Sequence, residues 1–273
     1  MEREEETVTV FDGSAPKDAE VRLIKLSECT QSLMALKEIV TDGAIEPLPD
    51  KALKIEFIGD SITCGYGVET DDPEEGFTTA TENAEKSYAA FLSDALDADR
   101  NLTAFSGHGI VSGYTDNPEK QNCSELVPPY YESAGRNGFR LPSGRIIEDI
   151  PWDFSVYQPQ QIVINLGTND LSWCMEYSDR KAEYSRLYTE FLKTVRKHNP
   201  GARIFCILGV MGTALNTSMA QAVEKYRNET GDGYISFHLL DEQDPQDGYG
   251  ANYHPSEATQ RKLADIVIKV ISD

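Results

Sequence analysis

Four short polar motifs each hold a residue type that acyl transfer requires. Their key residues are Ser61, Gly107, Asn169 and His254. A serine hydroxyl is a weak nucleophile that needs a positioned base, and a histidine can accept its proton near neutral pH. The backbone N–H groups of Ser61 and Gly107, together with the Asn169 amide, can stabilise an oxyanion. The set predicts a serine hydrolase in which Ser61 and His254 are catalytic.

The segments that must position these residues alternate between strand and helix from residue 54 onward. Strands are expected over residues 54–59, 101–105, 161–166, 202–208 and 234–240. Helices are expected over 83–97, 179–198 and 213–229, and from Ser256 to the end. This alternation predicts a parallel sheet with helices on both faces, a three-layer α/β/α fold. Ligands bind at the carboxyl ends of such strands, where the strand order reverses. If the first strand lies between the second and third, Ser61, Gly107 and Asn169 converge.

Residues 1–50 have a different pattern. Residues 21–26 and 36–40 look like strands with no helix between them, and residues 45–50 look like an extended linker. Two or three antiparallel strands are too few to form a stable domain. We therefore predict an N-terminal β segment with a linker over residues 1–50, and a catalytic domain over residues 51–273.

The composition narrows the function classes. The chain has 273 residues, 25 of them Lys or Arg and 46 Asp or Glu, which gives a net charge of −21. Such acidity argues against nucleic acid and anionic membranes as partners, and is compatible with a neutral substrate. The acidic start has no apolar stretch typical of a signal peptide. A cytoplasmic location is expected for the sequence as written, or an extracellular one if the N-terminus is truncated.

The cysteines and histidines give no sign of a metal or cofactor. The five cysteines are scattered and form no CxxC motif, which argues against a disulfide scaffold and a cysteine-rich zinc site. The four histidines are also scattered, and none forms a carboxylate–histidine cluster with ligand spacing. We expect neither a cofactor nor a metal. No motif indicates an oligomeric state.

The four motifs, in this order at strand ends, resemble those of the SGNH (GDSL) hydrolase superfamily. The amino-acid sequences around the motifs are most similar to those of carbohydrate esterase family two. The matching stretches are residues 55–67, 151–154, 164–170 and 247–256. The resemblance implies a flavodoxin-like five-stranded sheet and removal of O-acetyl groups from plant polysaccharides such as xylan and glucomannan. It also implies an acetylated oligo- or polysaccharide as the substrate partner. Members of that family have a jelly-roll domain before the catalytic domain, and residues 1–50 look like its end only.

One departure from the superfamily pattern concerns the group that orients His254. Most members have an aspartate three residues before the histidine, where this chain has Ala251, and family-two esterases often have one two residues before it, where this chain has Asn252. The resemblance therefore implies a Ser–His dyad, which the Asn252 amide could help. We predict that the orienting group is a carbonyl oxygen, from the loop before the helix that follows the first strand or from residues 171–174.

Several residues near the motifs allow more than one interpretation. Trp173, four residues after Asn169, could stack on a sugar ring or be a core or rim aromatic, and Tyr66 and Tyr253 are weaker candidates for substrate binding. Asp60 and Asp170 are expected to bond loop backbone rather than to form an acid–base pair. Two alternative functions stay open. One is an SGNH lipase- or thioesterase-like enzyme acting on acyl chains, and the other is a non-catalytic carbohydrate-binding protein.

Overall fold

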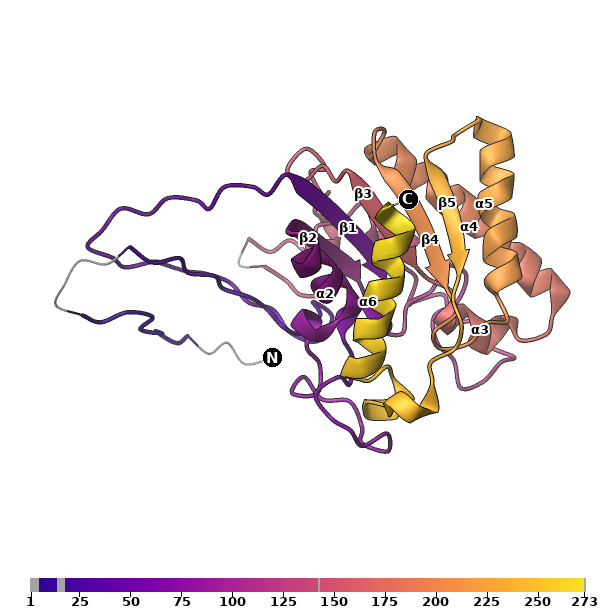
Figure 1. Cartoon of the computed structure of the whole chain (residues 1–273), viewed down its shortest axis with the longest axis horizontal. Coiled ribbons are helices and arrows are strands. Elements are labelled where there is room, and N and C mark those ends of the chain that lie inside the picture. Colours follow the sequence, from indigo (N-terminus) through magenta and orange to yellow (C-terminus); the bar gives the residue numbers. More distant parts are fainter. Residues whose placement is uncertain (1–4, 14–17, 142, 273) are drawn as a thin grey trace.

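A five-stranded parallel sheet forms the centre of the molecule (Figure 1). The structure is a computed structural model that describes residues 5–13, 18–141 and 143–272. The strands are β1 (Leu53–Gly59), β2 (Ala98–Ala104), β3 (Gln161–Asn165), β4 (Arg203–Leu208) and β5 (Ile235–Leu239). Their order across the sheet is β2-β1-β3-β4-β5, so the strand order reverses at β1. The predicted three-layer α/β fold is confirmed, with β1 between β2 and β3 as the convergence of the motifs requires.

Helices cover both faces of the sheet. Helices α2 (Tyr88–Ala95) and α6 (Glu257–Ser272) pack on one face, and α4 (Ser178–His198) and α5 (Asn216–Thr230) on the other (Figure 1). Alternate residues of a strand point to opposite faces, so Phe57 joins the core under α2 and α6 while Ile58 joins the core under α4 and α5. The central strands are apolar on both faces because both faces are covered.

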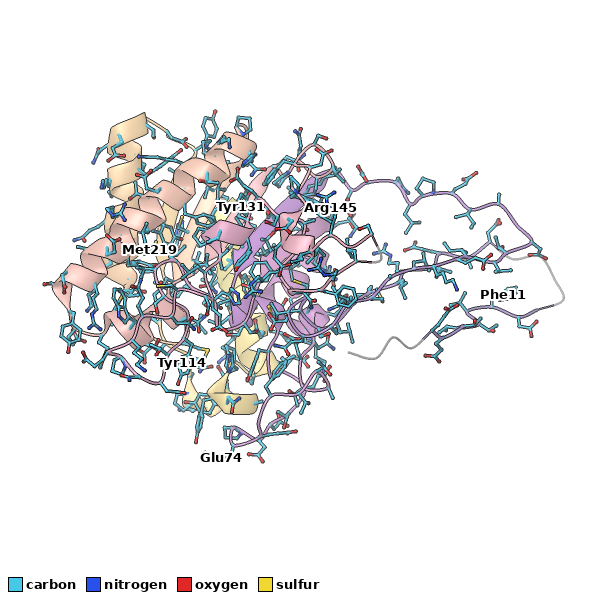
Figure 2. All side chains as sticks on the ribbon, turned by 180° about the vertical axis from the view of Figure 1, so that it is seen from behind. Phe11, Glu74, Tyr114, Tyr131, Arg145 and Met219 are labelled. Carbon is cyan, nitrogen blue, oxygen red and sulfur yellow. The ribbon has the colours of Figure 1, made fainter. Side chains whose placement is uncertain are left out.

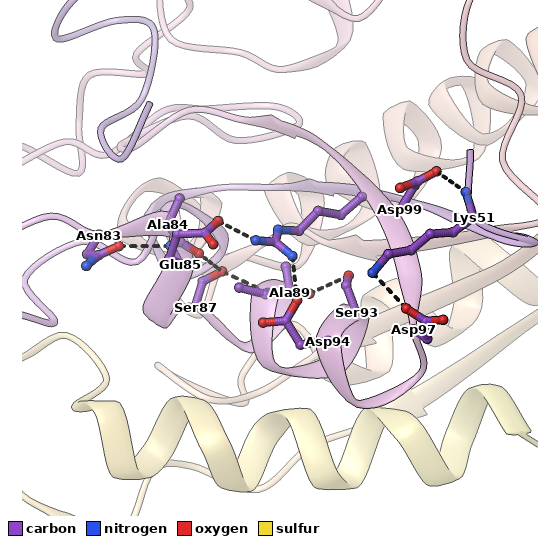
Figure 3. A network of polar contacts seen from close by, with 12 residues as sticks. Lys51, Asn83, Ala84, Glu85, Ser87, Ala89, Ser93, Asp94, Asp97 and Asp99 are labelled. Atoms are coloured by element: carbon purple, nitrogen blue, oxygen red, sulfur yellow. Dashed lines mark hydrogen bonds and ion pairs between the residues drawn. The ribbon is translucent and has the colours of Figure 1, made fainter. Parts of the chain in front are cut away.

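The helix expected over residues 83–97 is divided in two. A short 3₁₀ helix, η1 (Ala84–Lys86), precedes α2, and Ser87 lies between them in an extended conformation (φ −79°, ψ 159°). The Ser87 hydroxyl donates to Ala84 O at 2.8 Å and accepts from Ala90 N–H at 3.4 Å. These bonds, shown in Figure 3, cap the end of η1 and the start of α2. The Ser87 side chain therefore sets the break between the two helices.

Shorter elements lie in the loops that connect the strands and the longer helices. They are α1 (Ser61–Cys64), α3 (Thr168–Cys174), and the 3₁₀ helices η2 (Pro128–Tyr130), η3 (Ile147–Asp149), η4 (Pro245–Asp247) and η5 (Ala251–Tyr253). The long stretch 112–145 thus carries a short helix and isolated bridges, such as Gly113 with Asn122. Among the described residues, no helix has the length and apolarity needed to span a bilayer.

Residues 5–50 are here called the N-terminal arm, and much of its described part, 5–13 and 18–50, extends away from the sheet, with Phe11 far along it (Figures 1 and 2). The strands expected over 21–26 and 36–40 are wrong, because the described part of the arm contains no strand. A strand needs a hydrogen-bonded neighbour, and most of the arm's apolar side chains stay exposed, for example Leu23 at 63% and Leu36 at 62%. The domain division at residue 50 stays a prediction.

Candidate active site

Ser61 lies at a tight turn between β1 and α1. Asp60 caps the helix, its carboxylate accepting from Ile62 N–H at 3.0 Å. A Cβ at Gly59 would stand 2.0 Å from the Thr63 hydroxyl, so the turn requires glycine at that position. The first helical turn leaves its N–H groups without intrahelical partners. The backbone N–H of Ser61 accordingly donates to none of the described residues and is available to a substrate.

The loop before α6 brings His254 to Ser61. The distance from His254 Nε2 to Ser61 Oγ is 2.9 Å, although 193 residues separate the two in the chain. This is the distance at which an imidazole can take the hydroxyl proton. The structure therefore places Ser61 and His254 within hydrogen-bond distance, as the predicted pairing requires.

The other ring nitrogen of His254 faces two backbone carbonyls. Nδ1 lies 3.2 Å from both Ala251 O and Asn252 O, and no carboxylate of a described residue bonds to it. The prediction of a carbonyl instead of a carboxylate is confirmed. The predicted source is wrong, since neither the loop before α1 nor residues 171–174 supplies the oxygen. Asn252 and Tyr253 adopt left-handed backbone angles (φ 49° and 59°), which turn the preceding carbonyls back toward the ring.

The Asn252 side chain does not contact the imidazole. Its amide donates to the Tyr66 hydroxyl at 2.7 Å, and the Tyr66 ring stacks on His254 with centroids 4.0 Å apart. Phe77 stacks on Tyr66 in turn at 4.5 Å. The Asn252 amide therefore acts on His254 through Tyr66, whose ring packs against the face of the imidazole.

We expect Asn252→Ala to lower kcat by about tenfold or less, well short of the ~10⁴ lost when a triad aspartate loses its carboxylate. The backbone carbonyls at Nδ1 remain in the variant, and only the bond to Tyr66 is removed. Steady-state kinetics on a nitrophenyl acetate would check this, with Asn228→Ala, an exposed residue of α5, as control. A 10⁴-fold loss would show that Asn252 acts on the imidazole directly.

Burial controls the protonation of His254. It lowers the pKa of the imidazole from its ordinary value near 6.5 to about 4, although the two carbonyls act in the opposite direction. The neutral form is therefore favoured, and this is the form that can act as a base. At pH 5.5 a group with a pKa of about 4 is roughly 97% deprotonated, against roughly 10% for an ordinary histidine.

We expect the His254 ring to titrate below pH 5 in the folded protein. NMR of histidine-labelled protein would measure this directly, with the His254→Gln variant identifying the resonance among the four histidines. A midpoint between pH 6 and 7 would contradict the effect of burial. Because the pKa is lowered, the base is lost only as pH falls through about 4, so activity should hold at mildly acidic pH.

Gly107 and Asn169 lie at the ends of the neighbouring strands. Gly107 has φ +77°, and its N–H donates to none of the described residues. Asn169, in α3 after β3, donates from Nδ2 to His108 O at 2.8 Å and contacts Asp60 Oδ2 at 3.4 Å. The first bond fixes the amide against the loop of Gly107. The second contact is long, so Asp60 holds the other N–H of the amide only weakly, and this N–H is the one left for a substrate oxygen.

Asp60 and Asp170 support the loops, as their sequence positions suggested. Asp170 Oδ1 accepts from three successive backbone N–H groups, of Ile110, Val111 and Ser112, at 2.6–3.0 Å. Both carboxyls are fully buried, and burial raises the pKa of Asp60 to about 7 and that of Asp170 to about 6. Their oxygens bond to loop backbone and to the Asn169 amide, as expected of residues that fix the turns rather than of paired carboxylates for acid–base work.

Comparison with known proteins identifies the family. The model of the GDSL-like lipase/acylhydrolase family matches residues 57–262. The chain belongs to this family. The cellulase/esterase CelE of Acetivibrio thermocellus is 38% identical over 216 residues, which are 78% of this chain and 24% of CelE. An acetylxylan esterase / glucomannan deacetylase of Cellvibrio japonicus is 28% identical over 270 residues, which are 97% of this chain and 69% of that protein.

Solved structures agree with this assignment. A family two carbohydrate esterase from Clostridium thermocellum, in complex with cellohexaose, has a TM-score of 0.68 and 36% identity. The acetyl xylan esterase Est2A from Butyrivibrio proteoclasticus has a TM-score of 0.76 and 25% identity. Each match covers 84% of this chain and 66% of the other. The chain thus spans about a quarter of CelE and about two thirds of these esterase structures.

The aromatic residues proposed for substrate binding have different surroundings in this GDSL-family chain. Trp173 is half-buried against the core, with the Arg180 guanidinium 4.8 Å from its ring centroid. Tyr66 packs on His254, as described above. Tyr253 is 50% exposed and bonds through its hydroxyl to Glu74, which Figure 2 labels on the loop between α1 and η1. Their contact with a sugar stays a prediction.

One buried cluster escaped the sequence analysis. Glu28 of the N-terminal arm, Cys64 of α1 and Glu82 bring their potential ligand atoms within 4.8 Å of one another. Burial raises the pKa of Cys64 far above its ordinary value, and that of Glu82 to about 7. Members of the cluster bond to one another: the Cys64 thiol donates to Glu28 Oε2 at 3.5 Å, and Glu82 Oε2 accepts from Glu28 N–H at 3.0 Å. No local spacing signals this cluster, because Glu28 and Cys64 are 36 residues apart.

We expect EDTA to leave the esterase activity of this GDSL-family chain unchanged. The groups that face the reaction are a hydroxyl, an imidazole, an amide and backbone N–H groups, and the carboxylate–thiol cluster already holds its own hydrogen bonds. Initial rates before and after dialysis against EDTA would check this. Inactivation that zinc or calcium reverses would assign a metal to the cluster.

Proposed function

We propose that the chain is a serine esterase that removes O-acetyl groups from carbohydrate. The observation that carries the proposal is the 2.9 Å contact between Ser61 Oγ and His254 Nε2, beside the available N–H groups of Ser61 and Gly107. The names of the relatives, acetylxylan esterase among them, support an acetyl ester of a polysaccharide as the substrate. The net charge of −21 suits an uncharged polysaccharide.

The reaction follows from the geometry in two halves. Ser61 Oγ attacks the acetyl carbonyl carbon while its proton moves to His254 Nε2. The N–H groups of Ser61 and Gly107 and the Asn169 amide hold the oxyanion. The imidazolium then protonates the sugar oxygen, which leaves as an alcohol, and the acetyl group remains on Ser61. In the second half His254 takes a proton from water, which attacks the acetyl-enzyme. The bond from Ser61 Oγ to the acetyl carbon then breaks, Oγ takes the proton back from His254, and acetate is released.

Acetate release from acetylated xylan, acetylated glucomannan and acetylated free sugars tests the proposal. We expect release from at least one polysaccharide, and faster hydrolysis of acetyl than of octanoyl nitrophenyl ester. Preference for the octanoyl ester would favour a lipase- or thioesterase-like enzyme. Failure of a fluorophosphonate to label Ser61, with no acetate released, would favour a non-catalytic carbohydrate-binding protein.

A further inference from the structure

Glu28 is the single buried residue among the described residues of the N-terminal arm. Its exposed fraction is 8%, while its neighbours in the arm are half-buried or exposed. Burying a carboxylate is costly unless hydrogen bonds compensate for the lost water. The arm therefore inserts one acidic side chain into the catalytic domain, and the contacts of that side chain indicate its role.

The Glu28 carboxylate bonds to the loop that carries Gly107. Its Oε2 atom accepts from Ser106 N–H at 2.6 Å, a short N–H···O bond. The same oxygen lies 3.5 Å from Cys64 Sγ, at the end of the helix that begins with Ser61. Glu28 thus contacts both elements whose backbone N–H groups form the proposed oxyanion hole.

Ser106 is held from its carbonyl side as well. His108 Nδ1 lies 2.9 Å from Ser106 O, and since a carbonyl only accepts, Nδ1 carries the proton. The His108 ring is 4% exposed, and burial lowers its pKa, so the ring stays neutral. In a trans peptide the N–H of one residue points opposite to the C=O of the residue before it. Fixing Ser106 O therefore fixes the direction of Gly107 N–H.

We propose that Glu28 is a positioning residue for the oxyanion hole. Its bond to Ser106 N–H holds the Phe105–Ser106 peptide, and His108 holds the next peptide, Ser106–Gly107, through Ser106 O. With both peptides held, Gly107 N–H stays directed toward the substrate oxygen. This inference rests on the proposed function of the same site. It gives the N-terminal arm a role in the reaction, although no described residue of the arm forms a hydrogen bond with Ser61 or His254.

The arm has other attachments that do not reach this loop. Ala84 N–H donates to Leu26 O at 2.9 Å, and the Cys29 thiol donates to Arg136 O at 3.3 Å. Cys29 is adjacent to Glu28 in the chain, but its bonds are to Arg136 and Asn137 rather than to Ser106 or Gly107. A Cys29→Ala variant therefore weakens the attachment of the arm without removing the bond to Ser106, which makes it a matched control.

The experiment compares the wild type with Glu28→Ala, Glu28→Gln and Cys29→Ala. We expect Glu28→Ala to lower kcat about 10–100-fold with KM within about twofold, since an oxyanion N–H acts in the transition state. Glu28→Gln keeps an amide oxygen that can accept from Ser106, so its loss should be intermediate. Cys29→Ala should behave as the wild type. The rate of Ser61 labelling by a fluorophosphonate should fall in the same order, because the phosphonyl oxygen also occupies the oxyanion hole during the reaction.

Thermal melts separate positioning from folding. The proposal is wrong, and Glu28 only anchors the arm, if Glu28→Ala and Cys29→Ala lose kcat equally. It is also wrong if Glu28→Ala melts at a lower temperature while its folded fraction keeps the kcat and the labelling rate of the wild type. A wild type that releases no acetate would refute the proposed function instead. The labelling comparison would still test Glu28 in that case, since it needs no acetyl substrate.

Discussion

Replacing Ser61 with alanine should abolish ester hydrolysis while the fold remains intact. Removing the nucleophile of a serine hydrolase lowers kcat on the order of 10⁴–10⁶-fold. The one hydrogen bond that Ser61 Oγ makes with a described residue is to His254, at the sheet edge and outside both hydrophobic cores. The free energy of unfolding should therefore change by only about 0.5 kcal/mol.

Turnover of a nitrophenyl acetate and thermal melting would be measured on the same preparation of Ser61→Ala. Ser93→Ala is the matched control, because Ser93 is also a buried serine but lies in α2 and bonds to Ala89 O. It should keep wild-type turnover. If Ser61→Ala retains most of its activity, another residue is the nucleophile.

Replacing Asn169 with alanine should lower kcat by about 10²–10³-fold with little change in KM. This is the usual loss for one oxyanion donor, since its bond strengthens as the carbonyl becomes an oxyanion. The variant also loses the bond to His108 O, so part of the effect reflects the position of the Gly107 loop.

Thr168→Ala is the control for Asn169, because the neighbouring Thr168 hydroxyl is buried without a hydrogen-bond partner. Its kcat should match that of the wild type. Labelling of Ser61 by a fluorophosphonate should be slow in Asn169→Ala and normal in the control. A change confined to KM would instead assign Asn169 to substrate binding.

The sequence by itself determined the fold class and the four residues at the sheet edge. Strands that are apolar on both faces, followed by amphipathic helices, allow few arrangements other than a covered parallel sheet. Parallel strands end at one edge, so motifs placed directly after β1, β2 and β3 meet once β1 lies between the other two. Local patterns carry this information, and the distances between Ser61, Asn169 and His254 follow from it.

The tertiary structure alone decided what supports these residues. The carbonyls at His254 Nδ1 depend on left-handed backbone angles at Asn252 and Tyr253, which no local pattern of these residue types signals. The expected strands of the N-terminal arm failed because strand formation depends on a neighbouring strand as well as on local propensity. Glu28 meets Ser106 across 78 residues. A carboxylate in a polar segment looks like solvated surface until the folded chain brings its partner to it.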